Sequence, residues 1–154
     1  MKPYMVKVFT EELEEMSWEQ KAIAVSSHNG DTEHIRVIQS ILTESELGLM
    51  QTPLSLPLMQ FGQQRRRPRR LYHSCSGEHA AILRGCRKKG WSRVGYIWPH
   101  HEFFIAYLEQ VRGVLGKNWE PKVVAKDGCG LPTMSMTVLE LARLYADLVT
   151  KKND

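Results

Sequence analysis

Apolar residues recur at helical spacing in five separate parts of the chain. This spacing predicts amphipathic helices, and we expect their apolar faces to form the core rather than to contact a cofactor. The five stripes are Ala22, Ile23 and Val25; Ile35, Ile38, Ile41 and Leu42; Ala80, Leu83 and Cys86; Phe103, Phe104, Tyr107, Val111 and Val114; and Val138, Leu141, Leu144, Tyr145 and Leu148.

Polar residues and glycines mark the ends of these predicted helices. A Ser or Thr followed three residues later by Gln or Glu is typical of a capping box, Asp can cap a helix, and Gly often ends one. The signals are Ser17 with Gln20, Thr137 with Glu140, Asp31, Gly48 and Gly90. They predict helices that begin at 17, 31 and 137, and helix ends near 48 and 90.

Two other segments have a different pattern. Residues 122–125 are rich in β-branched side chains and predict a short strand that leads into a glycine turn. Residues 51–70 hold Pro53, Pro57 and Pro68 and predict a long irregular loop, which is basic at its end. The class predicted is therefore α+β and helix-rich.

Composition narrows the class further. The chain has 154 residues, 42% hydrophobic and 25% charged, which is typical of one globular domain. No stretch approaches the roughly 20 apolar residues that a membrane span needs, so we expect no membrane association. The first residues have no apolar leader and the three cysteines have no Cys-x-x-Cys spacing, so we expect a cytoplasmic protein.

The net charge of +4 comes largely from five arginines between 65 and 70. Such a cluster can bind phosphates of nucleic acid, but it can also be a solvated loop. No aromatic residues are interleaved for base stacking, so we favour the loop and consider nucleic acid an unlikely partner.

Two short segments combine a cysteine, a glycine and an acidic residue: Cys75-Ser76-Gly77-Glu78-His79 and Asp127-Gly128-Cys129-Gly130-Leu131-Pro132. A thiolate at a helix N-terminus is stabilised and is a good metal ligand. Glu78 and His79 follow Cys75 by three and four residues, so either could reach the same ion. Two thiolates, one of these side chains and a water would make an open zinc site, whereas the alternative is a pair of buried cysteines that act as small hydrophobic residues.

The segment Ser26-Ser27-His28-Asn29-Gly30 is a hydroxyl-rich helix end. A serine becomes a nucleophile when a base, such as lysine, takes its proton. The segment could equally be a plain C-terminal cap.

These segments, taken in order, resemble the bacterial type II L-asparaginases related to the Rhizobium enzymes. The matching motifs are Lys2-Pro3, Ser27-His28-Asn29-Gly30 with His34, and the two cysteine segments. The resemblance implies part of a fold similar to the serine β-lactamases and glutaminases, and hydrolysis of L-asparagine to aspartate and ammonia.

The resemblance also implies residue roles. Lys2 would be the lysine of one serine–lysine pair and Ser27 the serine of a second, although Ser26 stays open. One Zn²⁺ would be held by Cys75, Glu78 and Cys129. His79 and Asp127 would support the substrate site.

Three departures from the family pattern shape the expectation. First, the serine of the first family motif would lie before Met1. Second, the family chain is about twice as long as this one and has a second lysine in its C-terminal half. Third, position 78, where the family motif has a lysine, is a glutamate in this chain. We therefore expect residues 1–154 to form a single domain, the central portion of an asparaginase domain, with exposed apolar surface. We also expect little or no activity from it alone, and a homodimer or a complementing chain as partner. The alternative is a non-catalytic zinc-binding or regulatory domain.

Overall fold

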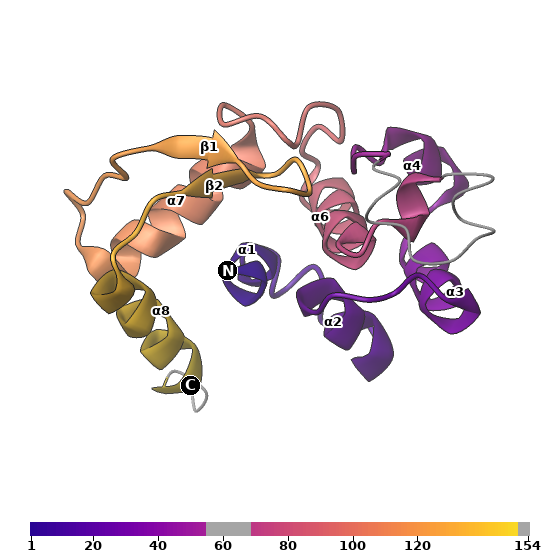
Figure 1. Ribbon diagram of the computed structural model, residues 1–154, viewed down its shortest axis with the longest axis horizontal. Helices are drawn as coiled ribbons and strands as arrows, with labels where there is room; N and C mark the ends of the chain where they lie inside the picture. Colours follow the sequence, from indigo (N-terminus) through magenta and orange to yellow (C-terminus); the bar gives the residue numbers. More distant parts are fainter. Residues whose placement is uncertain (55–68, 151–154) are drawn as a thin grey trace.

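Helices form most of the protein in the computed structural model, which describes residues 1–54 and 69–150 (Figure 1). Within these ranges there are seven α-helices, one short 3-10 helix and one antiparallel sheet of two strands. The elements in chain order are α1 (Lys2–Lys7), α2 (Trp18–Val25), α3 (Thr32–Ile41), α4 (Glu44–Leu49), η2 (Arg70–Tyr72), α6 (Ser76–Lys89), α7 (Glu102–Leu115), β1 (Val124–Lys126), β2 (Pro132–Met134) and α8 (Val138–Thr150). The helix-rich class is confirmed.

The local signals at the helix ends have the predicted effect. Ser17 and Gln20 make both bonds of the capping box at the start of α2, because each side chain accepts a hydrogen bond from the other residue's backbone N–H. Asp31 Oδ1 accepts a hydrogen bond from the backbone N–H of His34, 3.0 Å away, and caps α3. Gly90 ends α6 in the left-handed region at a φ of 71°, which glycine adopts without strain.

Two predicted boundaries were wrong. The helix that begins at Asp31 does not run to Gly48, because the chain leaves the helical region at Leu42 and a separate capping box at Thr43 starts α4. The predicted strand at 122–125 lies at 124–126. It pairs with the unpredicted strand β2, with Ala125 opposite Thr133.

The predicted loop at 51–70 can be compared only at its two ends. Residues 51–54 and 69 have no regular structure, and η2 begins at Arg70. Residues 55–68, with most of the arginine cluster, lie outside the described part of the chain.

Helix α6 lies at the centre of the fold, with α7 and the sheet on one side and α2 and α3 on the other (Figure 1). Its residues from Ser76 to Leu83 are all buried. Such close packing depends on two glycines. A Cβ on Gly77 would lie 2.3 Å from the carbonyl oxygen of Ile23 in α2, and one on Gly85 would lie 2.2 Å from the ring of Phe9. The backbone of α2 can therefore approach the first turn of α6, where the cysteine motif lies.

We predict that Gly77→Ala lowers the free energy of unfolding by about 2–3 kcal/mol, because the added methyl group meets backbone rather than a flexible side chain. Gly113→Ala in α7 is the matched control: nothing lies within 4 Å of its added Cβ, and the change raises stability by about 0.5–1 kcal/mol. Urea denaturation measures both. A Gly77→Ala protein as stable as the wild type would contradict the packing of α2 on α6.

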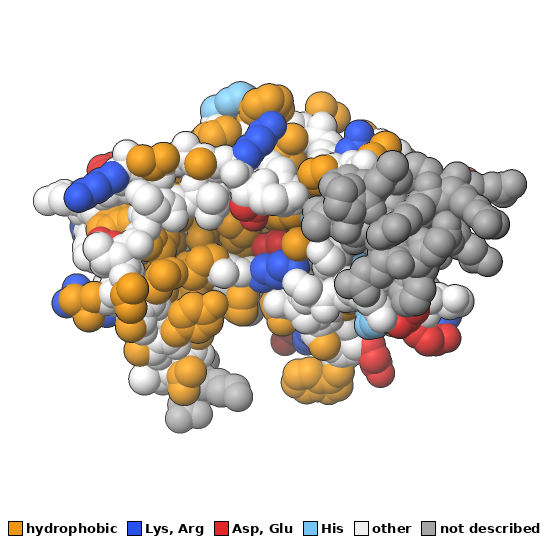
Figure 2. Space-filling view, in the orientation of Figure 1, with side chains coloured by type: hydrophobic (Ala, Val, Ile, Leu, Met, Phe, Trp, Pro, Cys, Tyr) orange, Lys and Arg blue, Asp and Glu red, His pale blue; other side chains and the backbone are white. Residues whose placement is uncertain are grey.

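Helix α8 departs from the prediction that its apolar stripe is core. Leu144 is buried and Leu141 and Leu148 are half-buried, but Val138 is 84% exposed and Tyr145 48% exposed. Figure 2 shows hydrophobic side chains gathered over α7 and α8 in this view. The expected exposed apolar surface is therefore present, because in the described part of the chain α8 packs mainly against α7.

None of the helices in the described ranges combines the length and hydrophobicity required to cross a lipid bilayer.

Candidate metal and hydrolytic site

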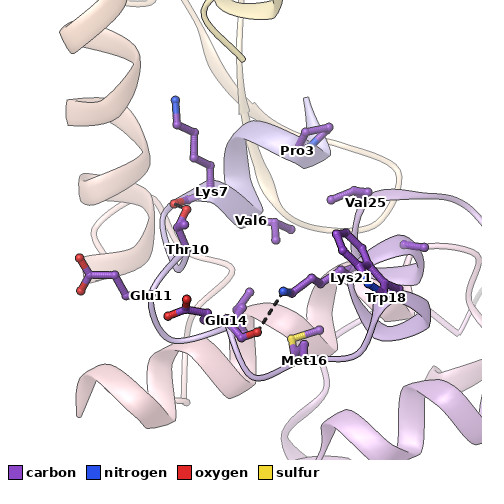
Figure 3. A pocket seen from close by; sticks show the side chains of 13 residues that line it. Pro3, Val6, Lys7, Thr10, Glu11, Glu14, Met16, Trp18, Lys21 and Val25 are labelled. Atoms are coloured by element: carbon purple, nitrogen blue, oxygen red, sulfur yellow. Dashed lines mark hydrogen bonds between the residues drawn. The ribbon is translucent and has the colours of Figure 1, made fainter. Parts of the chain in front are cut away.

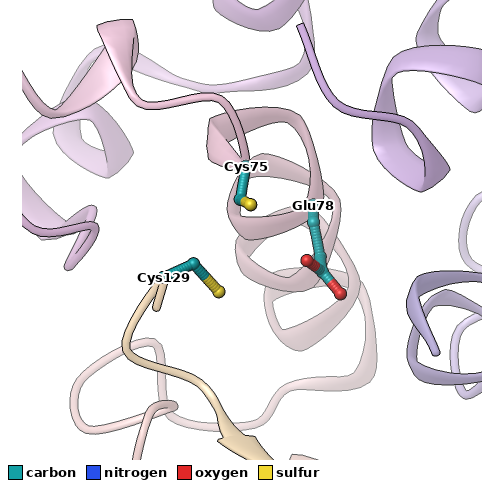
Figure 4. A group of neighbouring side chains, drawn as sticks. All are labelled: Cys75, Glu78 and Cys129. Atoms are coloured by element: carbon teal, nitrogen blue, oxygen red, sulfur yellow. The ribbon is translucent and has the colours of Figure 1, made fainter. Parts of the chain in front are cut away.

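Three potential metal ligands converge beside the first turn of α6 (Figure 4). Cys75 is the N-cap residue of α6, Glu78 lies one turn further, and Cys129 lies in the turn between the strands. The ligand atoms of the three residues all lie within 4.8 Å of one another. The sequence spacing alone left Glu78 and His79 as alternatives, and the structure brings Glu78 to the two thiols.

The turn that carries Cys129 is shaped by Asp127. Its Oδ1 accepts a hydrogen bond from the backbone N–H of Cys129 at 2.8 Å, and its carbonyl oxygen accepts one from Gly130 at 3.1 Å. Gly130 has a φ of 92°, which favours glycine. Asp127 is exposed and organises this turn, and it is not one of the metal ligands.

The sulfur atoms of Cys75 and Cys129 are close enough for each thiol to shift the pKa of the other. The contact with Cys129 is the largest cause that lowers the pKa of Cys75, with further lowering from His73 and Lys2 and an opposing effect of burial. The same contact, together with burial, raises the pKa of Cys129. A metal ion that binds both sulfur atoms would displace the protons that they carry.

Glu78 is 2% exposed, and burial raises its pKa to about 8. The Nζ of Lys2 lies 3.8 Å from Oε2 and opposes this rise, but burial has the larger effect. Oε1 is buried and has no hydrogen-bond partner among the described residues. A buried oxygen without a partner costs free energy, so a cation placed between Glu78 and the two thiols would satisfy it. Two thiols and a carboxylate are also ligands that Zn²⁺ accepts, so this residue set fits zinc.

Lys2 lies between Glu78 and the segment that carries the predicted nucleophile. Its Nζ donates a hydrogen bond of 2.6 Å to the backbone carbonyl oxygen of Ser26, at the end of α2. Ser26 and Ser27 are both exposed. The structure therefore places Lys2 against the segment that carries Ser27 and also beside Glu78.

His79 lies next to Glu78 in α6 and is not one of the three potential metal ligands. It is completely buried, and its Nδ1 lies 2.7 Å from the hydroxyl oxygen of Tyr96. That hydroxyl also accepts a hydrogen bond from the backbone N–H of Gln51 at 2.9 Å, so Tyr96 joins α6 to the segment at Gln51. Burial lowers the pKa of His79 to about 3, which keeps the ring neutral.

The sequence did not reveal the function of His28 and Ser76 in holding this region together. The Nδ1 of His28 accepts a hydrogen bond from the backbone N–H of Gly30, so Nε2 carries the proton and donates it to the Oγ of Ser76, 2.9 Å away. Ser76 in turn donates to the carbonyl oxygen of Leu71 at 2.7 Å. This chain of bonds fixes the segment after Ser27 to the start of α6. Both residues lie in the recognised motifs, but no spacing rule pairs residues 48 positions apart.

A groove of about 740 Å³ lies between α1 and α2 (Figure 3). Its lining is mostly apolar and includes Val6, Met16 and Trp18. Ser27, Glu78 and the cysteines are not part of the lining. An apolar groove offers few partners to the polar groups of an amino-acid amide, so we do not assign it to the substrate.

The fold and site define a helix-rich protein in which a lysine links a serine segment to a cluster of two thiols and a carboxylate. The family model of L-asparaginase II matches residues 2–154, and the chain therefore belongs to the L-asparaginase II family. A comparison with curated proteins found no match.

Proposed function

We propose that the site hydrolyses the side-chain amide of L-asparagine to give L-aspartate and ammonia. The observation that carries the proposal is the position of Lys2, whose Nζ contacts the carbonyl oxygen of Ser26 while lying 3.8 Å from Glu78. Membership of the L-asparaginase II family supports the same chemistry. The predicted partner is thus L-asparagine.

In the proposed reaction, the hydroxyl oxygen of Ser27 attacks the amide carbon of the substrate. The resemblance assigns Lys2 and Ser27 to two different pairs, but Lys2 is the lysine that contacts this segment, through the carbonyl oxygen of Ser26, so we assign it the role of base. It takes the hydroxyl proton and passes it to the departing nitrogen, which leaves as ammonia. A water molecule then hydrolyses the resulting ester, and Ser27 regains its proton. His79 and Asp127 act indirectly, since one supports α6 and the other shapes the turn of Cys129.

The test is steady-state ammonia release from L-asparagine by the purified, monodisperse chain supplied with Zn²⁺. L-Glutamine and D-asparagine serve as comparison substrates. The departures from the family pattern predict little or no ammonia release by these residues alone, whereas the proposal predicts ammonia release. The assay therefore distinguishes the two. Folded protein that releases no ammonia would overturn the proposal.

The second candidate function is zinc binding without catalysis. The observation that favours it is the convergence of Cys75, Glu78 and Cys129 within 4.8 Å, with the unpartnered Oε1 of Glu78. When bound, Zn²⁺ would act as a Lewis acid and would also stabilise the fold, because it joins α6 to the turn after β1.

We predict that the chain binds one Zn²⁺ and that Glu78→Gln weakens the affinity by about 100-fold or more, since a charged ligand is lost. Cys86→Ala is the control: Cys86 is buried in α6 outside the ligand group, and its removal leaves zinc affinity unchanged. Equilibrium dialysis with metal analysis measures both. Equal zinc retention by wild type and Glu78→Gln would contradict this assignment.

The remaining expectations are kept as proposals. We propose that residues 1–154 form one domain that is part of a serine β-lactamase/glutaminase-like fold, which family membership supports. Three free cysteines support a reducing compartment such as the cytoplasm. The exposed side chains of Val138 and Tyr145 support a homodimer or a complementing chain that covers α8.

A further inference from the structure

The two thiols of the metal cluster are also placed to react with each other. Cys75 and Cys129 are 54 residues apart in the sequence, yet their sulfur atoms lie within 4.8 Å of each other. Figure 4 shows both sulfur atoms directed into the space beside Glu78. Two thiols at this separation can form a disulfide if one of the backbone segments shifts to bring the sulfur atoms into bonding distance.

The backbone around Cys129 permits such a shift. Cys129 lies between Gly128 and Gly130 in the turn that joins the two strands. Nothing lies within 4 Å of a Cβ built on Gly128, so the turn has open space on that side. Asp127 and Gly128 are exposed, which leaves the turn free of packing on its outer face.

Access differs between the two thiols. Cys75 is half-buried, with the hydroxyl of Ser74 at 3.9 Å from its sulfur, whereas Cys129 is 3% exposed. A small oxidant from solvent therefore reaches Cys75 first, and Cys129 is in position to react with the oxidised sulfur.

We propose that Cys75 and Cys129 form a reversible disulfide when a peroxide oxidises the site, and that the bound metal is released in the same event. The metal-release part rests on the proposed zinc site, whereas disulfide formation rests on the two sulfur atoms alone. Oxidation would thereby remove two of the three metal ligands at once and turn the site off until a thiol reduces it.

The chemistry balances with hydrogen peroxide as the oxidant. The thiolate of Cys75 attacks one peroxide oxygen, the O–O bond breaks, and hydroxide leaves while Cys75 becomes a sulfenic acid. Cys129 then gives its proton to the hydroxide just released, its sulfur attacks the sulfur of Cys75, the S–O bond breaks, and a second hydroxide leaves. The two sulfurs together lose two electrons, which reduce the peroxide, and Zn²⁺ leaves unchanged in charge.

Cys86 provides an internal control for this reaction. It is fully buried within α6, and burial raises the pKa of its thiol to about 12, so it remains protonated and unreactive. Of the three cysteines, two are therefore expected to react and one to stay reduced.

The experiment treats the zinc-supplied chain with a small excess of hydrogen peroxide at neutral pH. We expect free thiols to fall from three to one, peptide mapping to show a Cys75–Cys129 cross-link, and a chromogenic chelator to detect released zinc. Added dithiothreitol restores all three thiols and zinc binding. Cys86→Ala forms the same cross-link and falls from two free thiols to none, whereas Cys129→Ser forms no cross-link and accumulates a sulfenic acid at Cys75 that dimedone traps.

The outcomes separate this inference from the metal proposal. A cross-link in protein that has not bound zinc supports disulfide formation and contradicts the proposed zinc site. Zinc that stays bound with three free thiols overturns the inference and leaves the metal site intact. Over-oxidation of Cys75 without a cross-link, or a cross-link that includes Cys86, also overturns it.

Discussion

Ser27→Ala lowers the rate of ammonia release from L-asparagine by about 1000-fold or more, because the proposed acyl-transfer step has no nucleophile without this hydroxyl. The side chain is exposed at the end of α2, so its removal leaves packing and stability unchanged. The loss therefore falls on the rate constant of the chemical step rather than on the amount of folded protein. Initial rates of ammonia release, together with thermal unfolding of both proteins, separate these effects.

Ser26→Ala is the matched control for this substitution. Lys2 contacts the backbone carbonyl oxygen of Ser26 and not its side chain, so the contact survives in the variant. We expect Ser26→Ala to keep its activity within about threefold of the wild type, in contrast to the loss expected for a nucleophile. If Ser26→Ala were inactive and Ser27→Ala active, the roles of the two serines would be exchanged. If both variants kept full activity, neither serine would be the nucleophile.

Local signals in the sequence predicted the helix starts well, since a cap involves residues only three positions apart. The side chains of Ser17 and Asp31 form the caps that their spacing indicates. The same reasoning failed after Ile41, because the single helix predicted from Asp31 to Gly48 is two helices, α3 and α4, in the structure. Thr43 with Glu46 is itself a capping box, but a continuous apolar pattern concealed it.

Long-range arrangement was harder to predict from the pattern. The strand β2 has only three residues and begins with Pro132, so it carries no alternation that could identify it. The exposed face of α8 was predicted as core because periodicity shows that a helix has an apolar face, not that another element covers it.

In the candidate site, too, contacts between residues far apart in the sequence were harder to predict than local features. The resemblance to L-asparaginases predicted that Cys75 and Cys129 share one site, and the structure places their sulfur atoms within 4.8 Å of each other. Their spacing of 54 residues could not have established this proximity. The tie between His28 and Ser76 was not predicted, because it depends on how the end of α2 meets the start of α6. The contact of Lys2 with Ser26 depends on the short helix α1, which no apolar pattern predicted.

Acid weakens the fold strongly between about pH 6.5 and pH 4, because two buried histidines must take up protons on unfolding. Burial lowers the pKa of His28 to about 4 and that of His79 to about 3, from an ordinary value of 6.5. Below pH 6.5 the unfolded chain binds a proton at each ring and the native state does not. The stability that each neutral ring contributes is thus fully present above pH 6.5 and is lost as the pH falls.

Each histidine contributes a slope of about 1.4 kcal/mol per pH unit in this window, so the two together cost on the order of 5 kcal/mol by pH 4.5. The lowered pKa of Cys75 acts in the same direction. Glu78 acts in the opposite direction, because its raised pKa gives stability that is lost as the pH rises from 4.5 to about 8. Below pH 6.5 the histidines and Cys75 together outweigh Glu78, and the free energy of unfolding falls with pH.

Urea denaturation of the metal-free protein at pH 7, 6, 5.5 and 5, with chelator present, measures this slope. His28→Gln and His79→Gln each reduce the pH dependence of the free energy of unfolding by about 1.4 kcal/mol per pH unit, which corresponds to one proton. This change is expected whatever effect the substitution has on stability at pH 7. His100→Gln is the control, because His100 is exposed and its removal leaves the slope unchanged. A wild-type protein whose free energy of unfolding is flat across this range, or variants that retain the full slope, would show that these two rings are not held neutral by burial.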